Sequence, residues 1–484
     1  MGPTPFTQMA DRGFDLELEQ RLESGRKHRL APVDRIDARG YVSEPPEGGL
    51  PVLGAAERLV FASNNYLGLT ADQHVQNAAR QAAATVGTGA GGSRVGTGDT
   101  IVHHDLERLL AETLGTEQAL AFPSGYTANV AAIVTLEPDV VFVDECVHAS
   151  TLDGCRLAGA EIVAYDHCDP DALKRELRAR DGQTGAETEG GGPTDGTDDE
   201  SWLLVTDSVF SIDGQVAPLE ALCAHAEAVG AWILVDESHA TGLYAGGGGI
   251  AHAEGVADRV HIQTGSLSTA LASQGGYVAG STALINCLID ERPFAASAGL
   301  TPTAAAAASE ALHRSKHGDA RERLWENVTR IRDGLQSLGY HVDGDSQILP
   351  VRLEQSGLAS EFVAALADAD VLVSGVDTAN ARSRGTTNTV ANAKSERPRN
   401  TTTEVTDPAT NGAGDTGVVT NRSSPPDDAR VSSNIDSNAP SPDTATDTVT
   451  HERVYVFPMA THTRDDIFDC LEAFQDVGEQ FNVL

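Results

Sequence analysis

One short stretch combines residue types that could act on a flat, charged heterocyclic ring. In "ILVDESHATG", Asp236 ends an apolar run and His239 follows three residues later. A carboxylate held in such a place can pair with a protonated ring nitrogen, while a neighbouring imidazole can hydrogen-bond a ring substituent. A solvated strand end gives the same pattern, because charges at strand ends are often purely structural.

Two further stretches could complete such a site. "FPSGYTAN" contains a Ser-Gly-Tyr turn at Ser124–Tyr126. If a helix starts there, its backbone N–H groups would face an anion such as phosphate, although an ordinary turn reads the same way. "VDECVHAS" places His148 just beyond another apolar run. Its imidazole could stack on an aromatic ring or simply cap the next helix.

The cysteines give no indication of a metal. The six are scattered along the chain, without a C-x-x-C pair and without metal-like spacing to histidine. This pattern predicts reduced thiols and no metal site.

The elements that must position these side chains follow from hydrophobic patterning. Short β-branched runs alternate with longer amphipathic stretches, which predicts an α/β fold with a parallel sheet and crossover helices. Ligands bind at the carboxyl ends of such strands. The expected strands are Val140–Glu145, Trp202–Asp207, Ala231–Glu237 and Val260–Thr264.

The rest of the chain contains one clear amphipathic helix and two low-complexity segments. After Arg464 the apolar side chains recur with helical spacing, which predicts a helix packed on the core. Gly182–Glu200 is a polar Gly/Thr/acid run, read as a surface insert, and residues 378–450 are rich in Thr, Asn, Ser and Asp and are expected to be disordered. The apolar face of the helix comprises Ile467, Leu471, Phe474, Val477 and Phe481.

The charge balance excludes some partners. Acidic residues outnumber basic ones 71 to 34, for a formal net charge of -37. This argues against a nucleic-acid partner. Because screening shortens to about 3 Å near 1 M salt, a halophilic protein of a salt-rich cytoplasm explains the composition best. No apolar leader or stretch of roughly 18 apolar residues is visible, so we expect a soluble cytoplasmic protein and no membrane partner.

These stretches, with "ASNNYLGLT", "GAGGSRVGTGD" and "TDSVFSIDG" in this order, resemble the α-oxoamine synthase family of pyridoxal 5'-phosphate (PLP) enzymes. The resemblance covers roughly residues 12–165, 202–376 and 453–484. Several independent motifs in the right order make it specific for the family.

The resemblance implies a PLP-dependent transferase fold of type I. A large domain (61–300) would hold a mostly parallel seven-stranded sheet, after an N-terminal arm (1–60) and before a smaller α+β domain (301–484). Active sites would lie at the interface of a homodimer. Carried over by position, Gly125, Tyr126 and Ser266 meet the cofactor phosphate. His148 stacks on the ring, Asp236 pairs with the pyridine nitrogen, and Ser211 and His239 hydrogen-bond the phenolic oxygen. Asn64 and Asn65 belong to the substrate-access segment.

The sequence departs from the family at the residue that matters most. In "GSLSTALASQGG", Thr269 stands where the family has the lysine that holds the cofactor covalently and takes the α-proton of the amino acid. Near the C-terminus, Arg453 fits the first place of the family's R-x-R pattern, and Tyr455 fills the second, which normally binds the substrate carboxylate. A Pro-Pro-Thr loop is also missing before it, and Val147 replaces an asparagine.

The lysines that remain offer no replacement by sequence position. The chain has four: Lys27, Lys174, Lys316 and Lys394. None belongs to a cofactor motif.

The family condenses an amino acid with an acyl-CoA and releases CO2; its biotin-synthesis branch uses alanine with pimeloyl-CoA or the carrier-protein thioester. We expect noncovalent PLP binding and strongly impaired turnover. Two other interpretations stay open: a noncatalytic PLP-binding protein that pairs with an active paralogue, and a sibling glycine acyltransferase.

Overall fold

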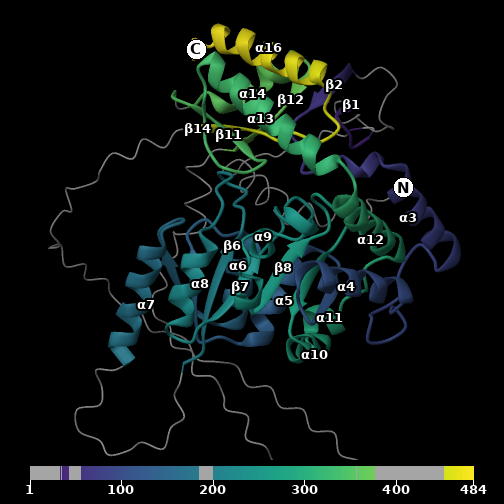
Figure 1. Ribbon diagram of the computed structural model, residues 1–484, viewed down its shortest axis with the longest axis vertical. Coiled ribbons are helices and arrows are strands. Elements are labelled where there is room, and N and C mark those ends of the chain that lie inside the picture. The colour runs from purple at the N-terminus through teal and green to yellow at the C-terminus, as the bar shows by residue number, and fades with distance from the viewer. Residues whose placement is uncertain (1–32, 34, 43–55, 185–199, 356, 377–451) are drawn as a thin grey trace, which may run out of the picture. The chain divides into compact units, whose positions relative to one another are not determined.

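The computed structural model describes residues 33, 35–42, 56–184, 200–355, 357–376 and 452–484 (Figure 1). By their contacts, residues 1–387 and 450–484 form one compact unit, to which all of the described residues belong. The predicted disordered segment at 378–450 and nearly all of the Gly182–Glu200 insert lie outside the described residues.

A seven-stranded sheet forms the centre of this unit (Figure 1). Its order is β3-β9-β8-β7-β6-β4-β5, and only β9 runs antiparallel to its neighbours. The central strands are buried along their whole length, as strands covered on both faces must be. The strands are β3 (Gln118–Phe122), β4 (Val140–Asp144), β5 (Glu161–Tyr165), β6 (Trp202–Asp207), β7 (Trp232–Asp236), β8 (Ile262–Ser266) and β9 (Gly276–Gly280).

All four strands expected from the sequence are present. Three begin and end within one residue of the expected bounds, whereas β8 begins two residues later than expected and ends at Ser266. The shift arises because Ala257–Arg259 forms a 3₁₀ turn (η4) whose C-cap is Val260. The α/β fold with a mainly parallel seven-stranded sheet is therefore confirmed.

Helices connect the strands and cover the sheet (Figure 1). Contacts join α5 to β8 and β9, α4 to β3, α8 to β7 and α7 to β5, while α12 packs on α3 and α4. These helices are α3 (Gln73–Thr85), α4 (Ile101–Leu114), α5 (Gly125–Leu136), α6 (Ala149–Ala158), α7 (Pro170–Thr184), α8 (Leu219–Glu227), α9 (Ile250–Ala253), α10 (Thr282–Asp290), α11 (Arg292–Ala295) and α12 (Pro302–His317).

Two smaller sheets involve the C-terminal part of the chain. One has the order β10-β11-β14-β13 and the other β1-β2-β12, so that a segment near the N-terminus pairs with one near residue 371. Helices α13 (Ala320–Leu338) and α14 (Ala359–Asp368) pack with α16 (Arg464–Gln480). The strands are β1 (Arg39–Val42), β2 (Ala56–Val60), β10 (His341–Val342), β11 (Leu349–Leu353), β12 (Val371–Leu372), β13 (Ser374–Val376) and β14 (Glu452–Val456).

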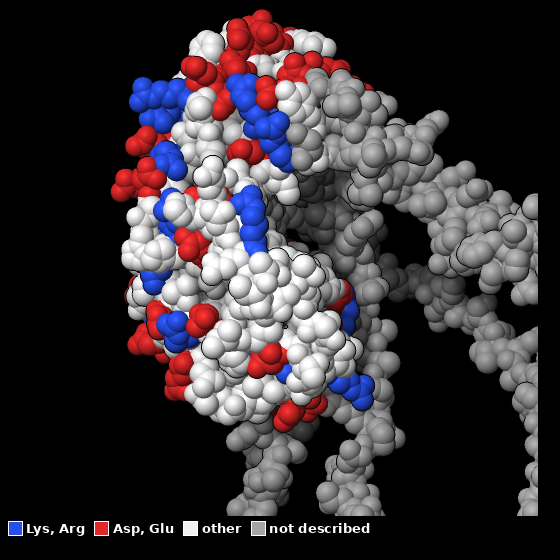
Figure 2. Space-filling view, turned by 90° about the vertical axis from the view of Figure 1, so that its right-hand side faces the viewer, with Lys and Arg blue, Asp and Glu red and all other residues white. Residues whose placement is uncertain are grey.

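Helix α16 confirms the amphipathic prediction. Its apolar face packs into the core, and Thr463 caps its first turn through a capping box with Asp466. Its outer face is acidic, and Figure 2 shows acidic side chains gathered at the top of the view, where α16 lies in Figure 1. The exposed acidic residues of the helix are Asp465, Asp469, Glu472, Asp476 and Glu479. None of the described helices is long and apolar enough to cross a membrane.

Candidate active site

A cavity of about 300 Å³ lies at the carboxyl edge of the seven-stranded sheet, where β6, β7 and β8 end at Asp207, Asp236 and Ser266. This is where parallel sheets bind ligands. None of the described residues that line it is a lysine or an arginine. The lining residues are Asn64, Ser124, Gly125, Tyr126, Asn129, His148, Asp207, Val209, Ser211, Asp236, Ser238, His239, Ser266, Ser268 and Thr269.

One side of the cavity suits an anion. Helix α5 begins at Gly125 against the cavity, with Ser124 as its N-cap and the Ser124 hydroxyl accepting from the Thr127 N–H at 3.1 Å. The positive end of this helix is therefore directed at the space beside the Ser266 hydroxyl. Gly276 permits this packing, because a Cβ there would lie 2.4 Å from the Gly125 nitrogen.

Asp236 is fixed as a hydrogen-bond acceptor in the cavity wall. Its side chain is buried, and its two carboxylate oxygens accept from the Asn129 amide at 2.6 Å and from the Ser238 N–H at 2.8 Å. Both bonds fix the position of the carboxylate in the cavity wall, where it can pair with a protonated ring nitrogen.

Two histidines border the same space. His148 is the N-cap of α6, which is one of the two roles expected for it from the sequence. Its Nδ1 lies 2.7 Å from the Ser150 hydroxyl. The Nδ1 of His239 lies 2.9 Å from the Tyr66 hydroxyl. Burial lowers the pKa of His239 to about 4, so its imidazole is neutral near pH 7. A neutral imidazole can donate one hydrogen bond and accept another.

The sequence analysis missed several lining residues, of which Asp207 is the most informative. Asp207 pairs in register with Asp236 on the neighbouring strand, and burial raises the pKa of its carboxyl well above the ordinary value. Its position at the end of a predicted strand could have identified it. Asn129, by contrast, lies in the second turn of α5 and reaches Asp236 only through the fold.

Thr269 lies in the cavity wall, as its place in the sequence motif predicts. It is 7% exposed, and its hydroxyl donates to the Ser238 carbonyl at 2.7 Å. Neither lysine among the described residues lines the cavity: Lys174 belongs to α7, and the Lys316 ammonium donates to Thr113 at 3.2 Å.

Not every predicted site residue reaches the cavity. Asn65 is turned away, with its amide donating to the Thr70 hydroxyl at 2.8 Å. Tyr455 is 1% exposed in β14, and its hydroxyl donates to the Ile212 carbonyl at 2.6 Å. Arg453 contacts the Asp343 carboxylate at 3.1 Å. The structure thus brings Asn64, Gly125, Tyr126, His148, Ser211, Asp236, His239, Ser266 and Thr269 to one cavity and leaves Asn65 and Tyr455 outside its lining.

The cavity fits a phosphorylated pyridine. A helix N-terminus with serine hydroxyls suits the phosphate, and a buried carboxylate suits the ring nitrogen. Two polar atoms in its wall, Asp207 Oδ1 and Asn129 Oδ1, are buried without a hydrogen-bond partner in the described chain. Buried polar atoms without a hydrogen-bond partner are typical of places where a ligand or a water molecule binds.

The mainly parallel seven-stranded sheet and the polar cavity at its carboxyl edge define the fold of PLP-dependent aminotransferases. The family model described as aminotransferase class I and II matches residues 56–400, and the chain belongs to this family.

Its relatives include proteins named 8-amino-7-oxononanoate synthase. One from Lysinibacillus sphaericus is 35% identical over 75% of this chain and 88% of its own length. One from Anaeromyxobacter dehalogenans is 39% identical over 69% of this chain and 83% of its own length.

Solved structures share the fold. A serine palmitoyltransferase from Sphingomonas wittichii matches with a TM-score of 0.72 and 24% identity over 98% of each chain. An 8-amino-7-oxononanoate synthase from Francisella tularensis matches with a TM-score of 0.59 and 20% identity over 88% of this chain and 99% of that one.

Proposed function

We propose that this chain is an 8-amino-7-oxononanoate synthase-like protein of biotin biosynthesis that binds PLP noncovalently and whose turnover is strongly impaired. The relatives of that name at 35% and 39% identity support the choice of reaction. The reaction of this type joins L-alanine to pimeloyl-CoA, or to the carrier-protein thioester, with loss of CO2.

A single observation carries the impairment. Thr269 lines the cavity between Ser268 and the Ser238 carbonyl, where the family motif calls for a lysine. A threonine hydroxyl forms no imine with the cofactor and is too weak a base to take the α-proton of an amino acid. Loss of a general base alone costs about 10²- to 10⁴-fold in rate.

The other side chains retain their proposed roles. Bound PLP would supply an electron sink for negative charge at the substrate α-carbon. Asp236, held in place by Asn129 and Ser238, would pair with the pyridine nitrogen. The N-terminus of α5 and Ser266 would hold the phosphate, and Ser211 and neutral His239 would face the phenolic oxygen. His148 would stack on the ring.

We retain the large domain at 61–300 and the small domain at 301–484 as a proposal, together with a dimer whose interface carries the sites. Asn65 and Tyr455 keep their proposed place in substrate access and carboxylate binding only if they move or act from a partner subunit. Their present contacts support a structural role instead.

A second candidate function is a noncatalytic PLP-binding partner of an active paralogue. The missing base favours it, since the fold and most of the cavity persist without the group that performs the chemistry. The glycine acyltransferase alternative differs only in its substrates and is distinguished by the same assay.

The test is release of CoA from pimeloyl-CoA plus L-alanine in molar salt with added PLP. Parallel reactions contain glycine with acetyl-CoA, and PLP binding is measured separately by equilibrium dialysis. Bound PLP with CoA release no faster than the enzyme-free control supports the proposal. Failure to bind PLP contradicts the cofactor assignment, and rapid CoA release with either substrate pair contradicts the impairment.

A further inference from the structure

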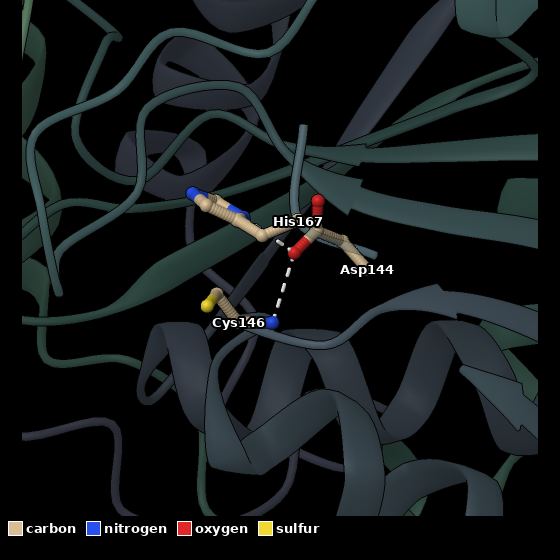
Figure 3. Close-up of side chains that lie close together, drawn as sticks. All are labelled: Asp144, Cys146 and His167. Carbon is tan, nitrogen blue, oxygen red and sulfur yellow. Dashed lines mark hydrogen bonds and ion pairs between the residues drawn. The ribbon is translucent and has the colours of Figure 1, made fainter. Parts of the chain in front are cut away.

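A second cluster of reactive side chains lies outside the cavity. Asp144 ends β4, Cys146 follows it, and His167 lies two residues after β5. The ligand-type atoms of the three all lie within 4.8 Å of one another (Figure 3). None of the three lines the cavity described above. The cluster combines a carboxylate, a thiol and an imidazole on fixed elements.

Hydrogen bonds fix the orientation of Asp144 and His167. Asp144 Oδ1 lies 2.7 Å from His167 Nδ1 and accepts from the Cys146 N–H at 2.8 Å (Figure 3). Asp144 Oδ2 accepts from the Cys168 N–H at 2.8 Å. The other ring nitrogen, His167 Nε2, lies 2.9 Å from the Asp213 carboxylate, in an ion-pair contact without ideal hydrogen-bond geometry.

A second thiol adjoins the same imidazole. Cys146 and Cys168 both interact with His167 through their side chains. Both residues are partly buried and are free cysteines. The backbone of Cys168 has a φ of 52°, a left-handed conformation that is uncommon for a residue with a Cβ and that aims its N–H at Asp144.

We propose that Asp144, Cys146 and His167, with Cys168 as the fourth donor, bind one divalent transition-metal ion of the Zn²⁺ or Co²⁺ type. Thiolate, imidazole and carboxylate are the donors that such ions take in tetrahedral sites, whereas Mg²⁺ and Ca²⁺ prefer oxygen alone. A carboxylate on the far nitrogen of a metal-binding histidine is the usual second partner, and Asp213 occupies that place.

The metal would replace a proton. His167 Nδ1 lies 2.7 Å from Asp144 and His167 Nε2 lies 2.9 Å from Asp213, so two carboxylates already surround the imidazole. Metal binding releases protons from the imidazole and the thiols, so affinity should rise with pH. Tetrahedral metal–nitrogen and metal–oxygen bonds of about 2.0 to 2.2 Å require the Asp144 and His167 donor atoms, now 2.7 Å apart, to separate by roughly 0.6 to 0.9 Å.

The site would stiffen two loops that serve the cavity. Residues 145–147 lead from Asp144 to His148, and Asp213 lies two residues beyond Ser211. His167 also packs edge-on against Phe210, with ring centroids 4.4 Å apart. A bound ion would therefore cross-link the segment that leads to His148 with residues 167–168, and His167 in turn contacts Asp213 and Phe210 beside Ser211.

Cobalt binding tests this proposal directly. Full-length, untagged protein is reduced with a phosphine, freed of metal with a chelator and titrated with Co²⁺ in molar salt. We expect one equivalent to bind with a near-ultraviolet thiolate-to-cobalt charge-transfer band and with visible bands of tetrahedral cobalt. Cys146→Ser should remove much of the charge-transfer band, and Asp213→Asn should weaken binding about 10- to 100-fold, as partners of metal ligands do.

The control is Cys287→Ser, because Cys287 is an exposed cysteine remote from the cluster in sequence and should leave the spectrum unchanged. Circular dichroism of each variant establishes that it is folded. Because replacing His167 risks unfolding, the cysteine variants carry the test. Absence of the charge-transfer band with excess Co²⁺, or an undiminished band in folded Cys146→Ser, would overturn the proposal.

Discussion

Replacing Thr269 with lysine should give the cavity the amine that the proposed function says is missing. In Thr269→Lys the new amine would project into a cavity of about 300 Å³ that no other lysine among the described residues lines. Burial would depress the pKa of that amine and favour its neutral, nucleophilic form. The variant should therefore bind PLP covalently, and its rate of CoA release should exceed that of the natural chain by about 10²- to 10⁴-fold, the usual value of a general base.

The substitution has a small structural cost. Thr269 loses its hydrogen bond to the Ser238 carbonyl, which contributes about 1 kcal/mol. The variant should remain folded, with a slightly lower melting temperature.

Two assays read the outcome. Borohydride reduction followed by intact-mass measurement detects PLP fixed to the protein, and thiol titration follows CoA release from pimeloyl-CoA and L-alanine. Thr329→Lys is the matched control, because Thr329 is exposed on α13 and its replacement adds the same charge outside the cavity lining. If folded Thr269→Lys gained no more reducible PLP than Thr329→Lys, Thr269 would not occupy the position of the cofactor lysine.

Three further perturbations test the cavity and the core. Asp236→Asn should raise the Kd for PLP about 10- to 150-fold, because it removes a charge-assisted hydrogen bond of about 1.5 to 3 kcal/mol. The control Asp258→Asn, at an exposed position, should leave the Kd unchanged. Equal effects of the two variants in equilibrium dialysis would contradict the pairing of Asp236 with the pyridine nitrogen. Burial lowers the pKa of His462 to about 4, against about 6.5 in the unfolded chain, so the unfolded state binds the proton first as the pH falls. This contribution should leave stability unchanged above about pH 7 and reduce it by up to about 3 kcal/mol between about pH 6.5 and 4. In chemical unfolding, the free energy of unfolding of His462→Gln should depend less steeply on pH between about pH 6.5 and 4 than that of the natural chain. An unaltered pH dependence would show that His462 is not its source. Tyr455→Phe should lose about 1 kcal/mol of stability by the same method, because its hydroxyl donates to the Ile212 carbonyl. Its Kd for PLP should stay constant because Tyr455 does not line the cavity, and a large loss of PLP binding would count against a structural role.

The sequence predicted those parts of the site that depend on strand ends and helix starts. Asp236 ends β7 and Ser124 opens α5, and both positions follow from local patterning. Thr269 was identified through a motif, and it lies in the cavity wall as that motif implies.

The parts that could not be predicted depend on contacts between distant segments. Asn129 and Asp236 are 107 residues apart and meet only because α5 packs against the sheet. The Asp144 cluster draws its donors from two loops more than twenty residues apart, so no short metal motif exists. Tyr455 was assigned by alignment alone, whereas its buried hydroxyl is used within the protein.

PLP affinity should respond to salt in an unusual direction, because no lysine or arginine is found among the described residues that line the cavity. PLP carries a phosphate dianion, and a chain of net charge -37 repels it at long range. Short-range attraction would come from hydroxyl donors, a helix terminus and the Asp236 carboxylate facing the ring nitrogen, which ions screen little once the ligand is enclosed. Most proteins that bind phosphate through basic side chains lose affinity as salt increases. Here added salt should raise the association rate of PLP and tighten its binding, so that a concentrated electrolyte acts as a condition for filling the cavity.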